Sequence, residues 1–206
     1  MKNERMLNNL NKISKISKSL IDDINRILEK GTIREKIRIK DNTPEILYKY
    51  GAKNLPMTMT STHLLENILT EKKAKEKGFK VNKKTHYHGL GKEKFIDAII
   101  QLDNPSAIYR WKSNNESNNY GSNDFIVLTE LITNETRREG RIIVLLFLEE
   151  IKGTYNIKSI YGKKEIFKYL NNYTKKGDLE KLYIKKEDSN KSGRVQSPTS
   201  LKTSSN

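Results

Sequence analysis

The fold is decided by residues 125–149, which read FIVLTELITNETRREGRIIVLLFLE. Two runs rich in Ile, Leu and Val, Phe125–Thr133 and Arg141–Glu149, flank a charged segment, Asn134–Gly140. Runs of this length and composition are typical of buried β-strands, and the polar segment between them is typical of a turn. The stretch therefore predicts two paired strands at the centre of the fold.

The residues around this pair extend the pattern. Shorter strands are expected at Ala107–Lys112 before it, and at Tyr155–Tyr161 and Leu182–Lys185 after it. A helix is expected at Lys163–Asn171. Because helices come first and an antiparallel meander follows, the order is typical of an α+β domain.

The N-terminal part predicts helices. Apolar residues in Met1–Lys40 recur three and four positions apart, which is the spacing of one helical face, and Gly31 is a plausible stop. Leu55–Thr60 is expected to be extended. A second helical segment is expected to start at Thr43-Pro44. Further helices are expected from about His63 to Lys77 (capped by Ser61 or Thr62 and ended by Gly78) and from about Lys92 to Leu102.

The composition bears on partners. Of the 206 residues, 40 are Lys or Arg and 25 are Asp or Glu, which gives a formal net charge of +15. Such a charge favours association with polyanions, nucleic acid first and an anionic membrane surface second. An AT-rich genome that encodes many Lys and Asn residues is the alternative explanation. The chain has no cysteine, which excludes disulfides and thiolate chemistry.

The pattern of apolar residues bears on location and domain organisation. Met1–Leu20 has no apolar core, so no signal peptide is expected, and the longest apolar run, Ile142–Leu148, is too short for a membrane span. We therefore expect a cytoplasmic protein, in the producing cell or in a target cell after delivery. Three segments are expected: an amphipathic helical arm (1–41), an α+β domain (42–187) and a flexible Ser/Thr/Lys-rich tail (188–206).

Standard nucleotide-binding and metal-binding motifs are absent from the sequence. There is no phosphate-binding glycine loop and no His-Glu-x-x-His helix. The histidines His63, His86 and His88 have no acidic partners at metal-ligand spacing. Glu149 and Glu150 are adjacent on a strand and point to opposite faces. A two-metal nuclease is disfavoured, and no metal or cofactor is expected.

His88 is the first candidate for catalysis. RNA cleavage without a metal needs a general base, a general acid and cations that stabilise the phosphorane. An imidazole titrates near neutral pH and serves as acid or base. His88 also precedes Gly89-Leu90-Gly91, where the backbone can approach a ligand closely. The alternative is a helix-capping or surface histidine.

A second group of candidates follows the strand at Tyr155–Tyr161. Ser159, Tyr161 and Lys163 place a hydroxyl, a phenol and an ammonium group before a helix, with Lys164 beside them. The alternative is an ordinary turn with solvated lysines. The remaining candidates for nucleic-acid binding are Lys83 and Lys84 in a basic loop, Arg110, and Trp111, which stacks a base or, more simply, packs in the core.

Several short motifs, taken in order, resemble one family, the C-terminal domain of phage MuF-type head-morphogenesis proteins. The resemblance covers about Asn42–Lys186 and depends on order and spacing. It is carried by Leu55–Thr60, Tyr87-His88-Gly89-Leu90, Leu102–Pro105, Phe125–Leu131, Ile142–Leu148, Ser159–Lys163 and Leu182–Ile184.

The resemblance implies membership of the barnase, EndoU, colicin-type and RelE-like nuclease group. It implies helices followed by a small four-stranded antiparallel sheet, and metal-independent RNase activity, often against tRNA or mRNA. The family's His-Gly-Leu motif falls on His88–Leu90 and its Ser-x-Tyr-Gly motif on Ser159–Gly162. A hydroxyl near the last strand would fall on Ser197 or Thr199, outside any predicted strand. Unlike the phage proteins that it resembles, the sequence starts at Met1, and no portal-binding or head-binding module is expected in it.

Three functions follow from these observations. The first is a phage-associated RNase toxin with RNA as substrate and a cognate immunity protein as partner. In that function His88 is the acid or base, Lys163 or Arg110 stabilises the phosphorane, and Tyr161 and Ser159 orient the phosphate. The second is a non-catalytic protein of a phage or mobile element that binds nucleic acid or a host protein. The third is a virion structural or packaging accessory.

Overall fold

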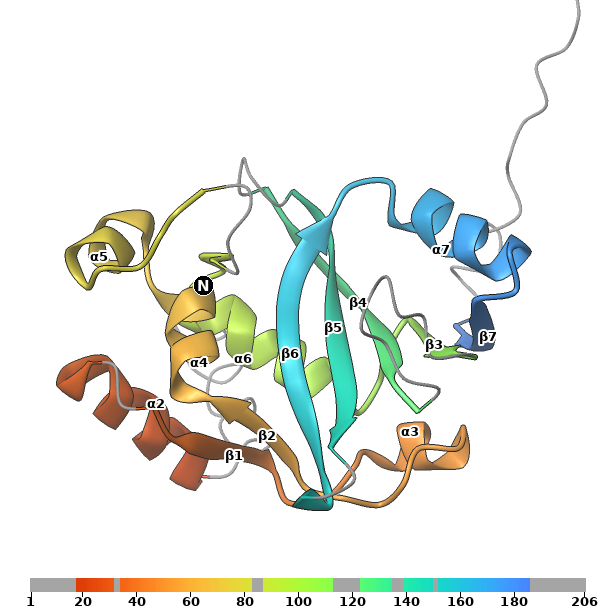
Figure 1. Ribbon diagram of the computed structural model, residues 1–206, viewed down its shortest axis with the longest axis horizontal. Helices are drawn as coiled ribbons and strands as arrows, with labels where there is room; N and C mark the ends of the chain where they lie inside the picture. Colours follow the sequence, from red (N-terminus) through yellow and green to blue (C-terminus); the bar gives the residue numbers. More distant parts are fainter. Residues whose placement is uncertain are drawn as a thin grey trace, which may run out of the picture.

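The computed structural model describes residues 18–31, 34–82, 87–112, 123–134, 139–149 and 152–185. Helices come mainly first and strands later, as in an α+β fold (Figure 1). The helices are α2 (Lys18–Lys30), α3 (Glu45–Lys49), α4 (Ser61–Ile68), α5 (Glu71–Glu76), α6 (Lys92–Gln101) and α7 (Ile166–Lys175). The strands are β1 (Lys36–Lys40), β2 (Met57–Thr60), β3 (Ala107–Trp111), β4 (Phe125–Thr133), β5 (Gly140–Glu149), β6 (Thr154–Lys163) and β7 (Leu179–Ile184).

The sheet is larger than predicted. It has seven strands in the order β1-β2-β6-β5-β4-β3-β7, and it is mixed, because β2 runs parallel to β6 while the other neighbours are antiparallel. The predicted small four-stranded antiparallel sheet of the barnase and RelE type is therefore wrong. The strands β1 and β2 extend the sheet beyond β6, and β7 extends it beyond β3.

Strand β1 lies within the segment that was predicted to be a helical arm. Its residues alternate, with Ile37 and Ile39 buried and Lys36 and Arg38 exposed. Alternation of this kind has the period of a strand rather than of a helix. The helical prediction holds for α2, which Gly31 follows, and its buried residues Leu20, Ile24 and Ile27 pack in the same core as β1.

The helix predicted from His63 to Lys77 is two helices. Thr60 caps α4 by accepting a hydrogen bond from the His63 N–H at 3.2 Å, so neither Ser61 nor Thr62 is the cap. Thr70 caps α5 in the same way, through the Lys73 N–H. The chain is extended at Thr70, and this breaks the helix.

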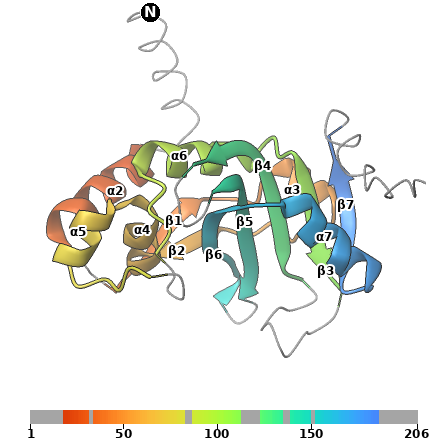
Figure 2. The ribbon, with the colours of Figure 1, turned by 90° about the horizontal axis from the view of Figure 1, so that it is seen from above.

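The sheet separates two hydrophobic cores. The larger core lies on the face covered by α2, α4 and α6, and the smaller core lies under α7 on the opposite face (Figure 2). Neighbouring residues of β3 show the division, because Ile108 belongs to the larger core while Tyr109 and Trp111 belong to the smaller one. In Figure 1, α7 lies over the β3–β7 side of the sheet and α4 lies beside β6.

Candidate active site

The segment Tyr87–Gly91 is fixed to the end of α4. The carbonyl oxygen of Glu66 accepts hydrogen bonds from the N–H groups of His88 (3.0 Å) and Gly89 (3.1 Å). The Tyr87 hydroxyl donates to the carbonyl oxygen of Leu69 at 3.1 Å. These contacts use carbonyl groups that a helix end leaves without intrahelical partners. They place His88 beside β6.

The backbone conformation and the contact with Tyr87 both require glycine at position 89. Its φ is +60°, and a Cβ atom added there would lie 2.4 Å from the Tyr87 hydroxyl. The tight turn therefore lets the Tyr87 ring fold back against the backbone, next to His88.

A bulge in β6 decides which face its polar residues occupy. Ile157 pairs with Leu146 and Ser159 pairs with Leu145, which leaves Lys158 as an extra residue. Ile157 and Ile160 both lie in the larger core, so the extra residue moves Ser159 to the other face. Bulges commonly redirect side chains in this way beside functional sites.

His88 and Ser159 meet at this bulge. His88 Nε2 lies 2.7 Å from Ser159 Oγ, and the His88 imidazole stacks on the Tyr161 ring with centroids 5.2 Å apart. His88 is 6% exposed and Ser159 is 8% exposed, while Tyr161 is half-buried. An imidazole within hydrogen-bond distance of a hydroxyl is an arrangement that can transfer a proton. Three of the four predicted catalytic residues thus form one cluster.

The predicted cations lie further along β6. Lys163 is two residues beyond Tyr161, and its ammonium group lies 4.3 Å from the centre of the Tyr169 ring on α7. Lys164 is exposed and pairs with Glu139 at 2.6 Å, which raises the pKa of Lys164. Both lie towards α7 rather than beside Ser159.

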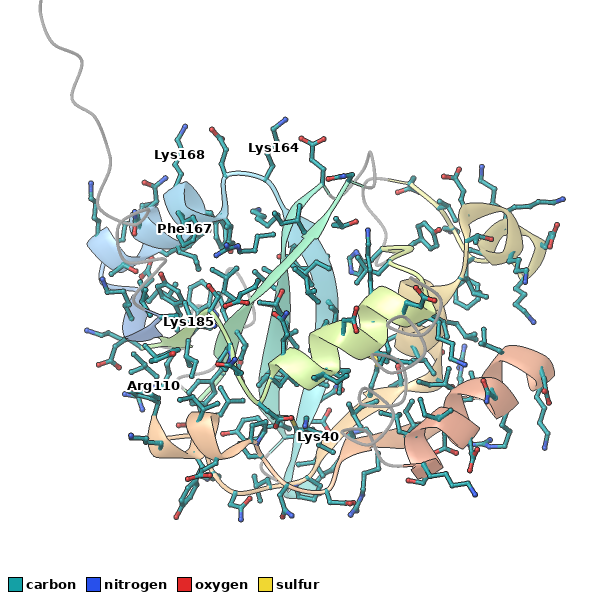
Figure 3. The ribbon with its side chains drawn as sticks, turned by 180° about the vertical axis from the view of Figure 1, so that it is seen from behind. Lys40, Arg110, Lys164, Phe167, Lys168 and Lys185 are labelled. Carbon is teal, nitrogen blue, oxygen red and sulfur yellow. The ribbon has the colours of Figure 1, made fainter. Side chains whose placement is uncertain are left out.

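Arg110 and Trp111 lie elsewhere. Trp111 is 1% exposed in the smaller core, with its ring edge-on to Tyr173, so it presents no face to a base. Arg110 forms an ion pair with Glu180 of β7 at 2.6 Å. Figure 3 shows Arg110 beside α3 near the lower edge of the view, whereas Lys164 lies at the upper edge. The structure therefore does not bring these two predicted binding residues to the cluster.

Two predicted binding residues, Lys83 and Lys84, lie outside the described residues, as do Ser197 and Thr199. Sequence reasoning missed Lys158, which adjoins Ser159 and is exposed. The signal was present in the sequence, because Tyr155, Ile157 and Ile160 depart from a strict period of two. Such a departure within a strand indicates a bulge.

Two carboxyl groups, Glu66 on α4 and Glu149 at the end of β5, have shifted pKa values. Burial raises the pKa of the Glu66 carboxyl, which lies 4.0 Å from His63. Burial also acts to raise the pKa of Glu149, but the hydrogen bond and charge of Lys36 outweigh it and the pKa is lowered. Glu149 also accepts a hydrogen bond from Asn156, so it links β1, β5 and β6.

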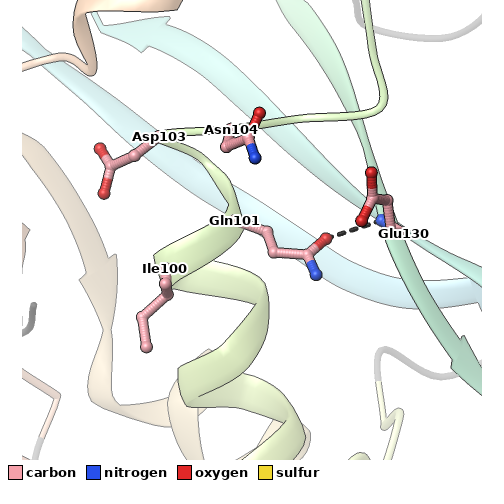
Figure 4. A pocket seen from close by; sticks show the side chains of 5 residues that line it. All are labelled: Ile100, Gln101, Asp103, Asn104 and Glu130. Atoms are coloured by element: carbon pink, nitrogen blue, oxygen red, sulfur yellow. Dashed lines mark hydrogen bonds between the residues drawn. The ribbon is translucent and has the colours of Figure 1, made fainter. Parts of the chain in front are cut away.

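A pocket lies at the end of α6, away from His88. It has a volume of about 350 Å³ and is lined by Ile100, Gln101, Asp103, Asn104 and Glu130, with Gln101 accepting a hydrogen bond from the Glu130 N–H (Figure 4). Among the described residues that line it there is no histidine or hydroxyl group. No cluster of three or more potential metal ligands occurs in the described parts of the chain.

No helix among the described residues is long and apolar enough to cross a membrane.

Comparisons with known proteins identify one family. Searches of curated proteins and of solved structures gave no significant match. The family model of the phage MuF C-terminal domain matches residues 80–191, more than half of the chain, and this range includes His88, Ser159 and Tyr161. The chain therefore belongs to the phage MuF C-terminal domain family.

Proposed function

We propose that this chain is a metal-independent endoribonuclease and acts as a phage-associated toxin. The observation that carries the proposal is the 2.7 Å contact between His88 Nε2 and Ser159 Oγ, with Tyr161 stacked on the imidazole. An imidazole, two hydroxyl groups and lysines further along β6 can supply the general base, the general acid and the cations that RNA transesterification requires. The net charge of +15 favours a polyanionic substrate.

In the proposed reaction the 2′-oxygen of RNA attacks the adjacent phosphorus and the bond from phosphorus to the 5′-oxygen breaks. His88 takes the 2′-hydroxyl proton, and the Tyr161 phenol or a water molecule protonates the leaving oxygen. Ser159 and Tyr161 hydrogen-bond the phosphate, and Lys163, which lies further along β6 beside α7, binds a flanking phosphate. The products are a 2′,3′-cyclic phosphate and a 5′-hydroxyl end.

As a toxin the chain would act in the cytoplasm on tRNA or mRNA, and the producing cell would hold a cognate immunity protein. Expression would then arrest growth. His88→Ala would relieve the arrest. Growth arrest that persists unchanged in His88→Ala would remove His88 from the proposed role.

The direct test is incubation of the purified chain with total RNA and with tRNA in excess EDTA. We expect discrete products with cyclic phosphate ends, and a loss of about 10²- to 10⁴-fold in cleavage rate for His88→Ala. His63→Ala is the matched control, because His63 is a partly buried histidine on α4 that makes no contact with Ser159 among those described. Equal loss in both variants would contradict the assignment of the site.

A second function, nucleic-acid binding without cleavage, is favoured by one observation. His88 and Ser159 are both less than one tenth exposed, so a phosphate reaches them only if the cluster opens. Intact RNA at high protein concentration, together with binding that weakens steeply with salt, would support this function instead.

A further inference from the structure

An aromatic side chain lies on the same sheet face as the His88–Ser159 pair. Leu145 pairs with Ser159, and Phe147 is two residues further along β5, on the same face. Two residues of a strand span about 7 Å, so the Phe147 ring is within one nucleotide of Ser159. Phe147 packs against the smaller core but is only half-buried, so part of the residue remains accessible.

Helix α7 does not cover this part of the sheet. At the start of β5, the Arg141 guanidinium lies 5.4 Å from the centre of the Phe167 ring on α7. Phe147 is six residues from Arg141 on the same strand, a distance of about 20 Å. In Figure 1, β5 and β6 continue well past α7 towards the ends that carry Glu149 and Thr154.

A cation accompanies the ring. The Lys158 ammonium group lies 5.6 Å from the centre of the Phe147 ring, on the exposed extra residue of the β6 bulge. Within the described residues Lys158 makes no ion pair, whereas Lys36 and Lys152 are both paired with Glu149. Lys158 is thus a cation next to Ser159 whose charge no described carboxylate neutralises.

An aromatic ring with an adjacent ammonium group is suited to a nucleotide. Bases stack on aromatic side chains whatever their sequence, and lysines neutralise the phosphates between them. A base can replace the ammonium group over the ring while the flexible lysine turns to the phosphate. Double-stranded RNA does not offer an unstacked base, so the arrangement selects single strands.

We propose that Phe147 and Lys158 form a subsite for single-stranded RNA, in which Phe147 stacks the base next to the scissile phosphate and Lys158 binds the adjoining phosphate. The subsite rests on the proposed function, since it deepens the account of that site's substrate. It also predicts that the chain favours unpaired loops and ends over duplexes.

The test measures binding apart from cleavage, in the His88→Ala background. The probe is a single-stranded RNA oligonucleotide that contains 2-aminopurine, whose fluorescence is quenched on stacking. We expect Phe147→Leu to weaken binding by roughly tenfold or more and to reduce the quenching, because leucine keeps the apolar packing but has no π face. We expect Lys158→Gln to reduce the salt dependence of binding by about one phosphate contact.

Two variants on α7 serve as controls. Phe167→Leu removes a ring that also lies near a cation, and Lys168→Gln removes an exposed lysine. Both should leave quenching and salt dependence unchanged, and thermal unfolding should confirm that all four variants are folded.

The outcomes separate the two proposals. If the wild-type chain cleaves RNA but Phe147→Leu binds and quenches as the parent does, the subsite is wrong and the RNase stands. If the chain does not cleave RNA but the quenching depends on Phe147, the subsite stands as a binding site and the RNase is wrong. Equal binding of duplex and single-stranded RNA would also overturn the subsite.

Discussion

The two halves of the sheet carry similar residues in different settings. The β6 half holds His88, Ser159 and Tyr161, and the β3–β7 half holds Arg110 beside Trp111. Both sets were candidates for RNA contact, since each combines an aromatic ring with a polar or cationic group.

The pairing of the strands separates them. At β3, the neighbour β7 supplies Glu180 to pair with Arg110, and α7 covers Trp111. At β6, β2 pairs only with the first part of the strand, through Tyr155 and Asn156. A bulge then moves Ser159 to the sheet face opposite the larger core, where it meets His88. On β3, strand pairing and the ion pair occupy the side chains that could bind RNA. On β6, the pairing with β2 ends after Asn156, and the rest of the strand is free to pack against the segment that carries His88.

The largest effect expected from this comparison concerns Trp111. Trp111→Ala removes a fully buried side chain from the smaller core and should lower the free energy of unfolding by about 3–5 kcal/mol. Urea denaturation measures this loss, and Tyr48→Ala, at an aromatic residue that is 59% exposed, is the control. A stable Trp111→Ala variant with weakened RNA binding would instead make Trp111 a binding residue.

The next effect concerns how His88 is positioned. Gly89→Ala places a Cβ atom against the Tyr87 hydroxyl and should shift His88, with a loss of roughly 10²-fold in RNA cleavage. Gly78→Ala is the matched control, because its φ of +80° carries the same backbone strain while no atom lies within 4 Å of the added Cβ. If both variants lose activity equally, backbone strain rather than the position of His88 is the cause.

A smaller effect concerns Glu149, which links three strands on the β6 half. Its pKa is lowered in the folded state, so its contribution is present above the unfolded pKa and is lost as the pH falls through the folded value. Glu149→Gln should lower the free energy of unfolding by about 1 kcal/mol at pH 7, since the pair with Lys36 is partly exposed.

Denaturation at pH 7 and at pH 3 checks this prediction. The difference between Glu149→Gln and the parent should shrink at the lower pH, because the carboxyl group loses its charge as the pH falls. A difference that stays constant with pH would show that packing rather than charge accounts for it.

The smallest effect is expected at Glu180 on the other half. The hydrogen bond from Arg110 lowers the pKa of Glu180, so the sign of the pH dependence is the same as for Glu149. This pair is more exposed, and Glu180→Gln should cost no more than about 0.5 kcal/mol at pH 7. Thermal unfolding of the two Gln variants side by side tests the order, and a larger loss for Glu180→Gln would reverse it.

Much of the fold could be predicted because local pattern and tertiary environment agree. The strand Phe125–Thr133 was predicted to the residue, since its first four residues are apolar and buried and polar residues follow its end at Thr133. The helix that follows Gly91 was also predicted, because its apolar spacing matches the face that packs against the larger core. Strand β1 was missed because its five residues follow a helical pattern that dominates the same window.

The candidate site was predicted in part. His88, Ser159 and Tyr161 were chosen for their chemistry, and the structure brings them together across 71 residues of sequence. Lys158 and Phe147 were not chosen, because their proximity depends on a bulge and on strand register, which pair residues distant in sequence. Trp111 was chosen but lies in the core, because a tryptophan side chain suits both a core and a binding face and the sequence does not separate the two.

The sequence by itself determined the composition of the protein: the net charge, the lack of cysteine, the central strands and the residue types able to transfer a proton. Only the tertiary structure decided which of those residues meet. The sheet order places β2 and α4 beside β6, the end of α4 holds His88, and one extra residue in β6 turns Ser159 towards it. The physical reason is that charge and side-chain period are local properties of the chain, whereas register and strand order depend on which apolar faces are buried together.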